Sequence, residues 1–271
     1  MRRVRKIRAI YSASLFLVFF TMPGSGVAQR PTESRSNLSA RQSLSPAPAG
    51  MTAEPGKNSE RAKSPPADDE IVVTAVGDVM LGTTFPDATG AALPPNDGAD
   101  LLREVAPLLK RGDVVLGNLE GPMVDGNIES PKCRGKAEGH CFAFRVPTRY
   151  GAHLKSAGFN VMGLANNHAM DFGEEGRKSS RHVLDQQGIA HTGEIGDIAH
   201  LTVKGRKIDI IAFATYPGAY NFLDLDDALN TIRKARAEAD LVIVSFHGGA
   251  EGTTHQHVAE VATDHTVPVR V

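Results

Sequence analysis

The sequence has few of the features that mark several common protein classes. It contains no tryptophan, aromatic residues make up only 6% of the chain, and the formal net charge is −1. A balanced charge provides no strong field for nucleic acid or an anionic membrane surface, so we expect no nucleic-acid partner. The sequence has no internal repeat and no CxxC pair of the kind that structural zinc sites use. The informative residues are polar ones at the ends of apolar segments.

No apolar run is as long as a membrane-spanning helix, which needs about 20 residues. The run at residues 10–22 follows a basic stretch, residues 1–9, that has no acidic residue. A small-residue cleavage pattern follows at residues 26–28. This order is typical of a secretory signal peptide, which we place at residues 1–28. We therefore expect an exported protein, periplasmic or at the cell surface, and an uncleaved signal anchor in the membrane is the alternative.

Large apolar residues are scarce between the predicted signal peptide and the first apolar strand. Residues 29–69 are instead rich in serine, proline, alanine, arginine and glutamate. Such a segment buries too little surface to offset the entropy cost of ordering it, so we expect a disordered linker. The folded domain is predicted at residues 70–271, which is long enough for one hydrophobic core.

Cysteine is also scarce, with only Cys133 and Cys141 present. They lie close together in a glycine-rich segment, and in an exported protein this predicts a disulfide. The alternative is a metal clip that also uses His140. A bridge here would pin a surface loop at residues 121–147, beside the end of the second predicted strand. That loop would either shape a substrate cleft or simply be a stabilised insertion.

Apolar strand patterns alternate with helical patterns along the predicted domain. This order predicts an α/β fold with a mixed sheet sandwiched by helices. Pro107 lies inside the first helical pattern and is expected to kink or split it. Glycines 158 and 188 are expected to end two helices, Asp224 to cap another, and residues 204–207 to form a hairpin turn between two strands. The predicted strands are 71–76, 113–119, 159–165, 189–192, 201–203, 208–214 and 241–245, and the predicted helices are 97–110, 148–156, 173–187 and 224–237.

Four of the apolar strands end in polar clusters. In sheets of this kind, ligands bind at the carboxyl ends of the strands, so we expect the clusters to converge. Carboxylate, carboxamide and imidazole groups together make a metal site of oxygen and nitrogen ligands. Taken singly, each of these residues also fits a turn or a helix cap. The clusters are Asp78; Asn118 and Glu120; Asn166, Asn167, His168 and Asp171; and His247 with Glu251.

These clusters resemble, in order, the motifs of the CapA family of capsule and poly-γ-glutamate synthesis proteins. The motifs read GDVMLG from residue 77, NLE from residue 118, NNHAMDFG from residue 166 and HGGAE from residue 247. The resemblance extends over residues 71–258. It implies a calcineurin-like metallophosphoesterase fold and a divalent metal cofactor, which would be Mn, Fe or Zn.

The resemblance also assigns roles to single residues. It implies that His168 is the catalytic residue, either as the acid that protonates a leaving group or as the stabiliser of developing charge. The implied metal ligands are Asp78, Glu120, Asn167 and His247. The implied substrate-binding residues are Asn118, Asn166, Asp171 and Glu251.

Two departures from the family pattern bear on the metal site. Met80 stands where metallophosphoesterases have a histidine, and a thioether is a poor ligand for hard cations, so a full two-metal centre is not expected. No Gly-His-x-His element follows His247, so we expect a domain that is incomplete at its C-terminus. The histidines of the tail, His255 and His257, form a pair that is either a chelating site or part of a polar loop.

The resemblance implies a role in the synthesis, anchoring or trimming of a capsular or poly-γ-glutamate-type polyanion. The protein would act as a metal-dependent hydrolase or transferase. Its expected partners are an anionic cell-surface polymer and membrane-bound polymer synthesis proteins. The alternative is a non-catalytic fragment or polymer-binding module with an incomplete metal site. A general phosphoesterase is a third hypothesis.

Overall fold

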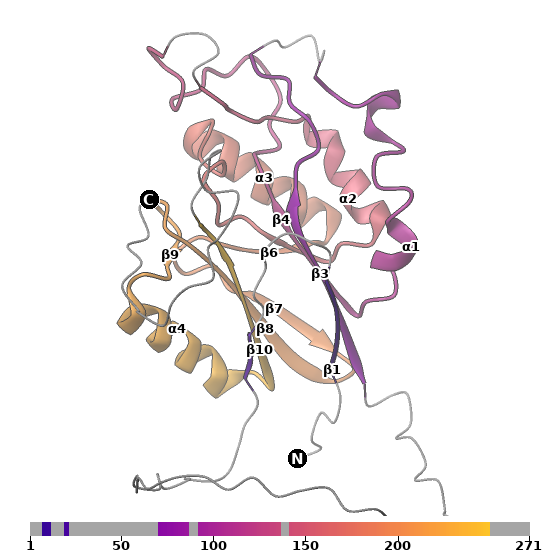
Figure 1. Ribbon diagram of the computed structural model, residues 1–271, viewed down its shortest axis with the longest axis vertical. Helices are drawn as coiled ribbons and strands as arrows, with labels where there is room; N and C mark the ends of the chain where they lie inside the picture. The colour runs from indigo at the N-terminus through magenta and orange to yellow at the C-terminus, as the bar shows by residue number, and fades with distance from the viewer. Residues whose placement is uncertain (1–6, 12–18, 22–69, 87–91, 137–140, 250–271) are drawn as a thin grey trace, which may run out of the picture. The chain divides into compact units, whose positions relative to one another are not determined.

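The computed structural model describes residues 7–11, 19–21, 70–86, 92–136 and 141–249 (Figure 1). The strands in these ranges form two sheets, with helices on the outer sides. None of the helices among these residues has both the length and the apolar character that crossing a membrane requires.

The first sheet is entirely parallel, and its strands lie in the order β1-β3-β4-β5-β6. Its central strand β4 is buried along its whole length, as expected for a parallel sheet that is covered on both faces. The strands are β1 (Ile7–Tyr11), β3 (Ile71–Val79), β4 (Val114–Leu119), β5 (Val161–Gly163) and β6 (Ala190–Thr192).

The second sheet is mixed, in the order β2-β10-β8-β7, and the short strand β9 also pairs with β8. β8 and β10 are parallel, whereas β7 and β2 are antiparallel to their neighbours. Lys204 and Gly205 form the predicted hairpin turn, both with positive φ, of 49° and 73°. The strands are β2 (Phe19–Thr21), β7 (Ala199–Val203), β8 (Arg206–Ala214), β9 (Tyr220–Asn221) and β10 (Leu241–His247).

The two sheets pack against each other through a shared apolar core. Side chains from both sheets that point into this layer are buried, and they include both β-branched residues and leucine. Burying them removes apolar surface from water, which is the main force that joins the two layers. The core includes Val73, Leu116, Val161, Ile208, Ile210 and Ile243.

Helices cover the outer face of each sheet. Buried residues of α1, α2 and α3 join those of β3, β4 and β5 in one core, and α4 packs on β8 and β10 in another (Figure 1). The helices are α1 (Ala106–Leu109), α2 (Gly151–Ala157), α3 (Gly173–Gln187) and α4 (Leu225–Glu238), with 3-10 turns η2 (Asn96–Gly98) and η3 (Thr148–Tyr150).

The helix boundaries follow the capping residues that the sequence offers. Gly158 and Gly188 end α2 and α3 in the left-handed conformation, with φ of 109° and 60°. Asp224 caps α4, because its carboxylate accepts a hydrogen bond from the backbone N–H of Asp227 at 3.1 Å. These predictions are confirmed.

The predicted helix at residues 97–110 is wrong over most of its length. The segment contains the 3-10 turn η2, a series of turns, and then the single turn of α1. Pro107 lies in the first turn of α1, where its missing N–H costs nothing, so it begins a helix and does not kink one. The apolar residues of this segment do not form one buried face, since Leu109 is in the core but Leu101 and Leu108 are 45% and 53% exposed.

The α/β class is confirmed, but a single mixed sheet between helices is not what the chain forms. After β6 the chain leaves the parallel sheet, and β7 to β10 build the second sheet across the core. Each sheet therefore has one face on the other sheet and one face under helices. Apolar strands look alike in sequence whether a helix or a second sheet covers them, so the pattern did not separate the two arrangements.

Part of the predicted signal peptide is paired in the structure. Residues 7–11 form β1 at the edge of the first sheet beside β3, and residues 19–21 form β2 beside β10. The pairing is that of the uncleaved chain and does not test whether the signal peptide is removed, so cleavage remains a prediction. The predicted linker at residues 29–69 lies outside the described residues.

Candidate metal centre

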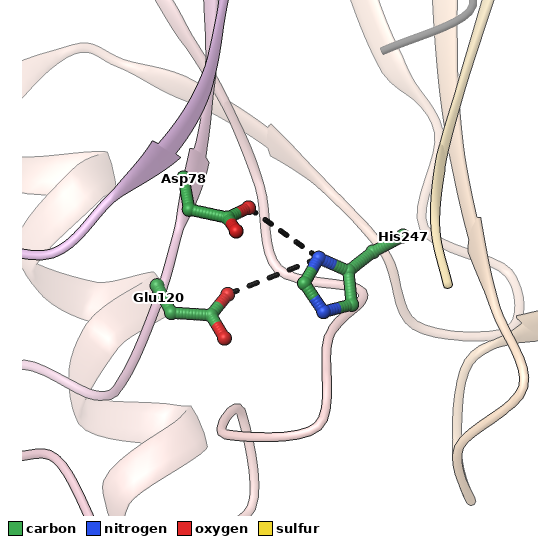
Figure 2. Close-up of side chains that lie close together, drawn as sticks. All are labelled: Asp78, Glu120 and His247. Carbon is green, nitrogen blue, oxygen red and sulfur yellow. Dashed lines mark ion pairs between the residues drawn. The ribbon is translucent and has the colours of Figure 1, made fainter. Parts of the chain in front are cut away.

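Three of the polar strand ends meet at one point, and they come from both sheets. Asp78 lies in β3, Glu120 follows β4, and His247 is the last residue of β10 (Figure 2). One ligand atom from each of these residues lies within 4.8 Å of the others. His247 Nδ1 is 3.4 Å from Asp78 Oδ1 and 3.9 Å from Glu120 Oε2. The predicted convergence of these three residues is therefore present.

A bulge in β3 helps to aim Asp78 at this point. Ala75 pairs with Leu116, but Asp78 pairs with Asn118, so β3 has one more residue than β4 between the two pairs. An extra residue of this kind bends the strand and turns the side chains that follow it. Asp78 remains 44% exposed, whereas the Glu120 side chain below it is 10% exposed. The site thus opens to solvent on the Asp78 side.

Two buried carboxamides hold the acidic pair in place. Asn118 Nδ2 donates hydrogen bonds to Asp78 Oδ1 and Glu120 Oε2, each at 2.8 Å, and lies 3.3 Å from His247 Nδ1. Asn118 Oδ1 in turn accepts from Asn166 Nδ2 at 3.0 Å. Both asparagines are only 3% exposed. They lie beneath the site as its support, and direct substrate contact by either one remains a prediction.

Asn167 contacts the opposite side of the His247 ring. Its Oδ1 lies 3.0 Å from His247 Nε2. A carboxamide oxygen only accepts, so Nε2 carries the hydrogen and Nδ1 is left facing the two carboxylates. Nδ1 is then the nitrogen that is available to a proton or a cation. The structure therefore gives Asn167 an orienting contact, and its predicted role as a direct metal ligand remains a prediction.

His168 lies at the inner side of the same site. Its Nε2 is 3.9 Å from Glu120 Oε1, and its Nδ1 is 2.6 Å from Asp171 Oδ2. The Asp171 side chain has 0% exposure and its carboxylate contacts the His168 ring, so it orients that imidazole. Direct substrate contact by Asp171 remains a prediction.

Lys132 and Phe144 complete this group, and the sequence reasoning missed both. Lys132 Nζ donates to Asp171 Oδ1 at 2.7 Å, and the Phe144 ring stacks on His168 with centroids 4.1 Å apart. The only hint was their position close to the two cysteines, with Lys132 just before Cys133 and Phe144 just after Cys141.

The two carboxylates of the cluster have pKa values shifted in opposite directions. The hydrogen bond with His247 lowers the pKa of Asp78, although partial burial opposes this shift. Burial raises the pKa of Glu120, and the negative charge of Asp78 adds to that rise, while His247 opposes it. Two carboxylates and one imidazole that crowd together in this way fit a single divalent cation, whose charge would favour both anionic forms.

The predicted disulfide between Cys133 and Cys141 is formed. Since both sulfurs are in the bridge, the alternative metal clip is wrong. Met80 is 45% exposed, and its sulfur accepts a hydrogen bond from the backbone N–H of Gly82. Glu251 and the tail histidines, His255 and His257, lie outside the described residues.

The family of the chain is decided by a match that includes the residues of this site. The family model described as "Bacterial capsule synthesis protein PGA_cap" matches residues 72–267, which is well over half of the chain. The chain belongs to this family.

Named relatives agree with the family match. The chain is 28% identical over 206 residues to the "Capsule biosynthesis protein CapA" of Bacillus anthracis, and 27% identical over 203 residues to the "PGA biosynthesis protein CapA" of Bacillus subtilis (strain 168). Each alignment covers 68% of this chain, and 48% and 50% of those proteins. An "Uncharacterized protein y4sH" of Sinorhizobium fredii is 35% identical over 125 residues, which are 46% of this chain and 25% of that protein. The chain therefore spans about half of the two CapA proteins or less.

Proposed function

We infer that the protein is an exported metal-dependent hydrolase or transferase that acts on a capsular, poly-γ-glutamate-type polyanion. Its place is the periplasm or the cell surface, with a signal anchor as the alternative to a cleaved signal peptide. It works beside membrane-bound polymer synthesis proteins, in the synthesis, anchoring or trimming of the polymer. Family membership supports the link to the polymer. The observation that carries the catalytic part is the convergence of Asp78, Glu120 and His247.

The donor set supports a divalent transition metal as the bound cation. Two carboxylate oxygens and an imidazole nitrogen suit Mn, Fe or Zn, and a thioether such as that of Met80 adds little to such a site. Asp78, Glu120 and His247 would hold the cation, and Asn167 would fix the His247 ring from the other side. A cation bound there supplies Lewis acidity and an activated water.

In this proposal, His168 moves a proton at the site. Asp171 accepts the Nδ1–H of the ring, so Nε2 is the nitrogen that exchanges a proton with the substrate. Nε2 points toward Glu120, at the inner wall of the cluster. When Nε2 is protonated, it delivers that proton to the atom that leaves as the polymer bond breaks. His168→Ala is therefore expected to lower kcat by about a hundredfold to ten-thousandfold while metal content is unchanged.

A second candidate function is a non-catalytic polymer-binding module with an incomplete metal site. The observation that favours it is Met80, which replaces the histidine that a two-metal phosphoesterase centre uses. Elemental analysis of the purified full chain separates the two candidates. Bound Mn, Fe or Zn near one equivalent supports catalysis, whereas a metal-free protein that still binds the polymer supports the binding module.

The activity test uses the full chain and two substrates. Poly-γ-glutamate is incubated with chelator-treated protein before and after Mn, Fe or Zn is added, and polymer length is followed on gels. A chromogenic phosphodiester is assayed in parallel to test a general phosphoesterase. Metal-dependent shortening or transfer of the polymer supports the proposal. Turnover of the phosphodiester alone would contradict the proposal and support a general phosphoesterase.

A further inference from the structure

We propose that the disulfide joins two short arms of the chain into a clamp that fixes the His168 imidazole. The arms are residues 130–133 and 141–144, and their positioning residues are Lys132 and Phe144. The clamp is a claim about structure. Its consequence for turnover rests on the proposed function.

The first arm contacts Asp171 with two donors. Lys132 Nζ donates to Asp171 Oδ1 at 2.7 Å and to the backbone oxygen of Asn167 at 3.3 Å. Ser130 Oγ donates to the backbone oxygen of Asp171 at 2.6 Å. The Lys132 side chain is 30% exposed, whereas that of Asp171 has 0% exposure, so the ammonium group lies between solvent and a buried carboxylate. A buried carboxylate that lost this cation would keep an uncompensated charge, which is strongly unfavourable.

The second arm contacts both members of the Asp171–His168 pair. The backbone N–H of Phe144 donates to Asp171 Oδ2 at 2.8 Å. The Phe144 ring stacks on the His168 ring, with centroids 4.1 Å apart and planes 29° apart. One residue therefore blocks a tilt of the imidazole and also supplies a donor to its partner.

The acceptor capacity of Asp171 explains why both arms are needed. Its two oxygens accept from Lys132 Nζ, from the Phe144 N–H and from His168 Nδ1. Lys132 Nζ also lies 3.1 Å from His168 Nδ1, but an ammonium only donates, and Nδ1–H already donates to the nearer carboxylate oxygen. With Nδ1 committed in this way, Nε2 is held toward Glu120. If either arm were lost, Asp171 would be free to turn toward other donors and the ring would turn with it.

The disulfide ties the two arms together. Cys133 directly follows Lys132, and Cys141 precedes Phe144 by three positions, so the bond joins the arms next to their contacts. A covalent bond at this place restricts the separation of the arms more than hydrogen bonds between exposed loops do. These contacts join distant parts of the sequence. Lys132 is 36 residues from His168, and Phe144 is 27 residues from Asp171.

The test compares four variants of the full chain. Lys132→Met removes the cation, Lys132→Arg keeps it, and a Cys133→Ser, Cys141→Ser double variant removes the bridge. Lys136→Met is the matched control, because Lys136 is an exposed lysine of the same loop. Two measurements do not depend on activity: hydrogen exchange of the Phe144 amide, and the rate at which diethyl pyrocarbonate modifies His168, followed by peptide mass spectrometry.

We expect Lys132→Met and the double variant to speed both reactions by about tenfold or more, because the Phe144 N–H and the His168 ring lose their fixed partners. Lys132→Arg is expected to recover most of the protection, and Lys136→Met to match the wild type. Exchange in α4 shows whether a change is local or a general loss of folding. Wild-type rates in both Lys132→Met and the double variant would overturn the clamp.

The activity measurement separates this proposal from the proposed function. With a substrate that the wild type turns over, Lys132→Met is expected to lower kcat by about tenfold to a hundredfold and to leave KM within about twofold. Lys132→Arg is expected to restore kcat. If no form of the protein turns over polymer or phosphodiester, while the protection of His168 still depends on Lys132, the clamp is supported and the proposed function fails.

Discussion

Asn167 Oδ1 lies 3.0 Å from Nε2 of His247, and this contact sets which ring nitrogen faces the carboxylates. Nε2 donates to the carboxamide, so Nδ1 faces Asp78 at 3.4 Å. A single asparagine thus orients the nitrogen donor of the candidate metal centre.

Asn167→Ala is expected to weaken Zn or Mn binding by about tenfold to a hundredfold, because the His247 ring loses the partner that fixes its orientation. Isothermal titration calorimetry on chelator-treated protein measures the affinity. Asn230→Ala is the control, since Asn230 lies in α4 and contacts Arg233. Metal affinity equal to that of the wild type would show that Asn167 neither orients nor holds a ligand.

Asn118→Asp is expected to destabilise the metal-free protein by about 2–4 kcal/mol, because a donor between Asp78 and Glu120 becomes a third carboxylate at a buried position. Added metal is then expected to raise the Tm of the variant more than that of the wild type, since a cation offsets the added charge. Thermal unfolding with and without Zn checks both parts. Asn221→Asp, at an exposed position, is expected to change little. An equal Tm gain from metal in the variant and the wild type would count against a cation at this point.

The pH dependence of stability is expected to include a contribution from His191, away from the metal centre. A hydrogen bond to Asp197 raises the pKa of His191 above its ordinary value, and the charge of Asp185 adds to the rise, whereas burial and Arg181 oppose it. A raised pKa in the folded state means that folding favours the protonated form of His191. The contribution is therefore fully present below the unfolded value of about 6.5 and is lost as pH rises through the folded-state pKa.

His191→Gln is accordingly expected to lose more stability at pH 5.5 than at pH 8.5, relative to the wild type. Urea unfolding at both pH values measures the difference. His182→Gln, at an exposed position of α3, is the control. A loss from His191→Gln that is the same at both pH values would refute the stabilising ion pair.

Ile243→Ala tests the packing of the two sheets on each other. Ile243 is 0% exposed, in the layer between the sheets, so its truncation leaves a cavity and is expected to cost about 2–5 kcal/mol of unfolding free energy. Leu229→Ala on α4 removes a side chain that is 45% exposed and is expected to cost less than about 1 kcal/mol. Chemical denaturation compares the two. Similar costs would argue against a tightly packed layer at Ile243.

The sequence predicts local features of this fold well, for reasons that are themselves local. Gly158 and Gly188 end helices because few other residues adopt positive φ readily. Lys204 and Gly205 turn a hairpin between two apolar strands. Asp78, Glu120 and His247 could be proposed as one site because strand ends converge in α/β sheets.

Other features depend on which surfaces meet in three dimensions. The spacing of Leu101 and Leu108 suggests a helix, yet no core receives these side chains and the segment forms turns instead. The roles of Lys132 and Phe144 depend on their contacts with Asp171 and His168, and no local sequence pattern predicts those contacts. The sequence also does not predict that one sheet packs on the other, because an apolar strand has the same pattern whether a helix or a second sheet covers it.

We propose that Asp78, Glu120 and His247 together bind one divalent cation. The most direct measurement is the metal content of the full chain after dialysis against Zn or Mn, by elemental analysis, for the wild type and for Asp78→Asn, Glu120→Gln and His247→Ala. We expect about one equivalent in the wild type and a loss of about tenfold or more in affinity for each variant. A wild type that retains no metal, or variants that all retain as much as the wild type, would contradict a metal centre built from these three residues.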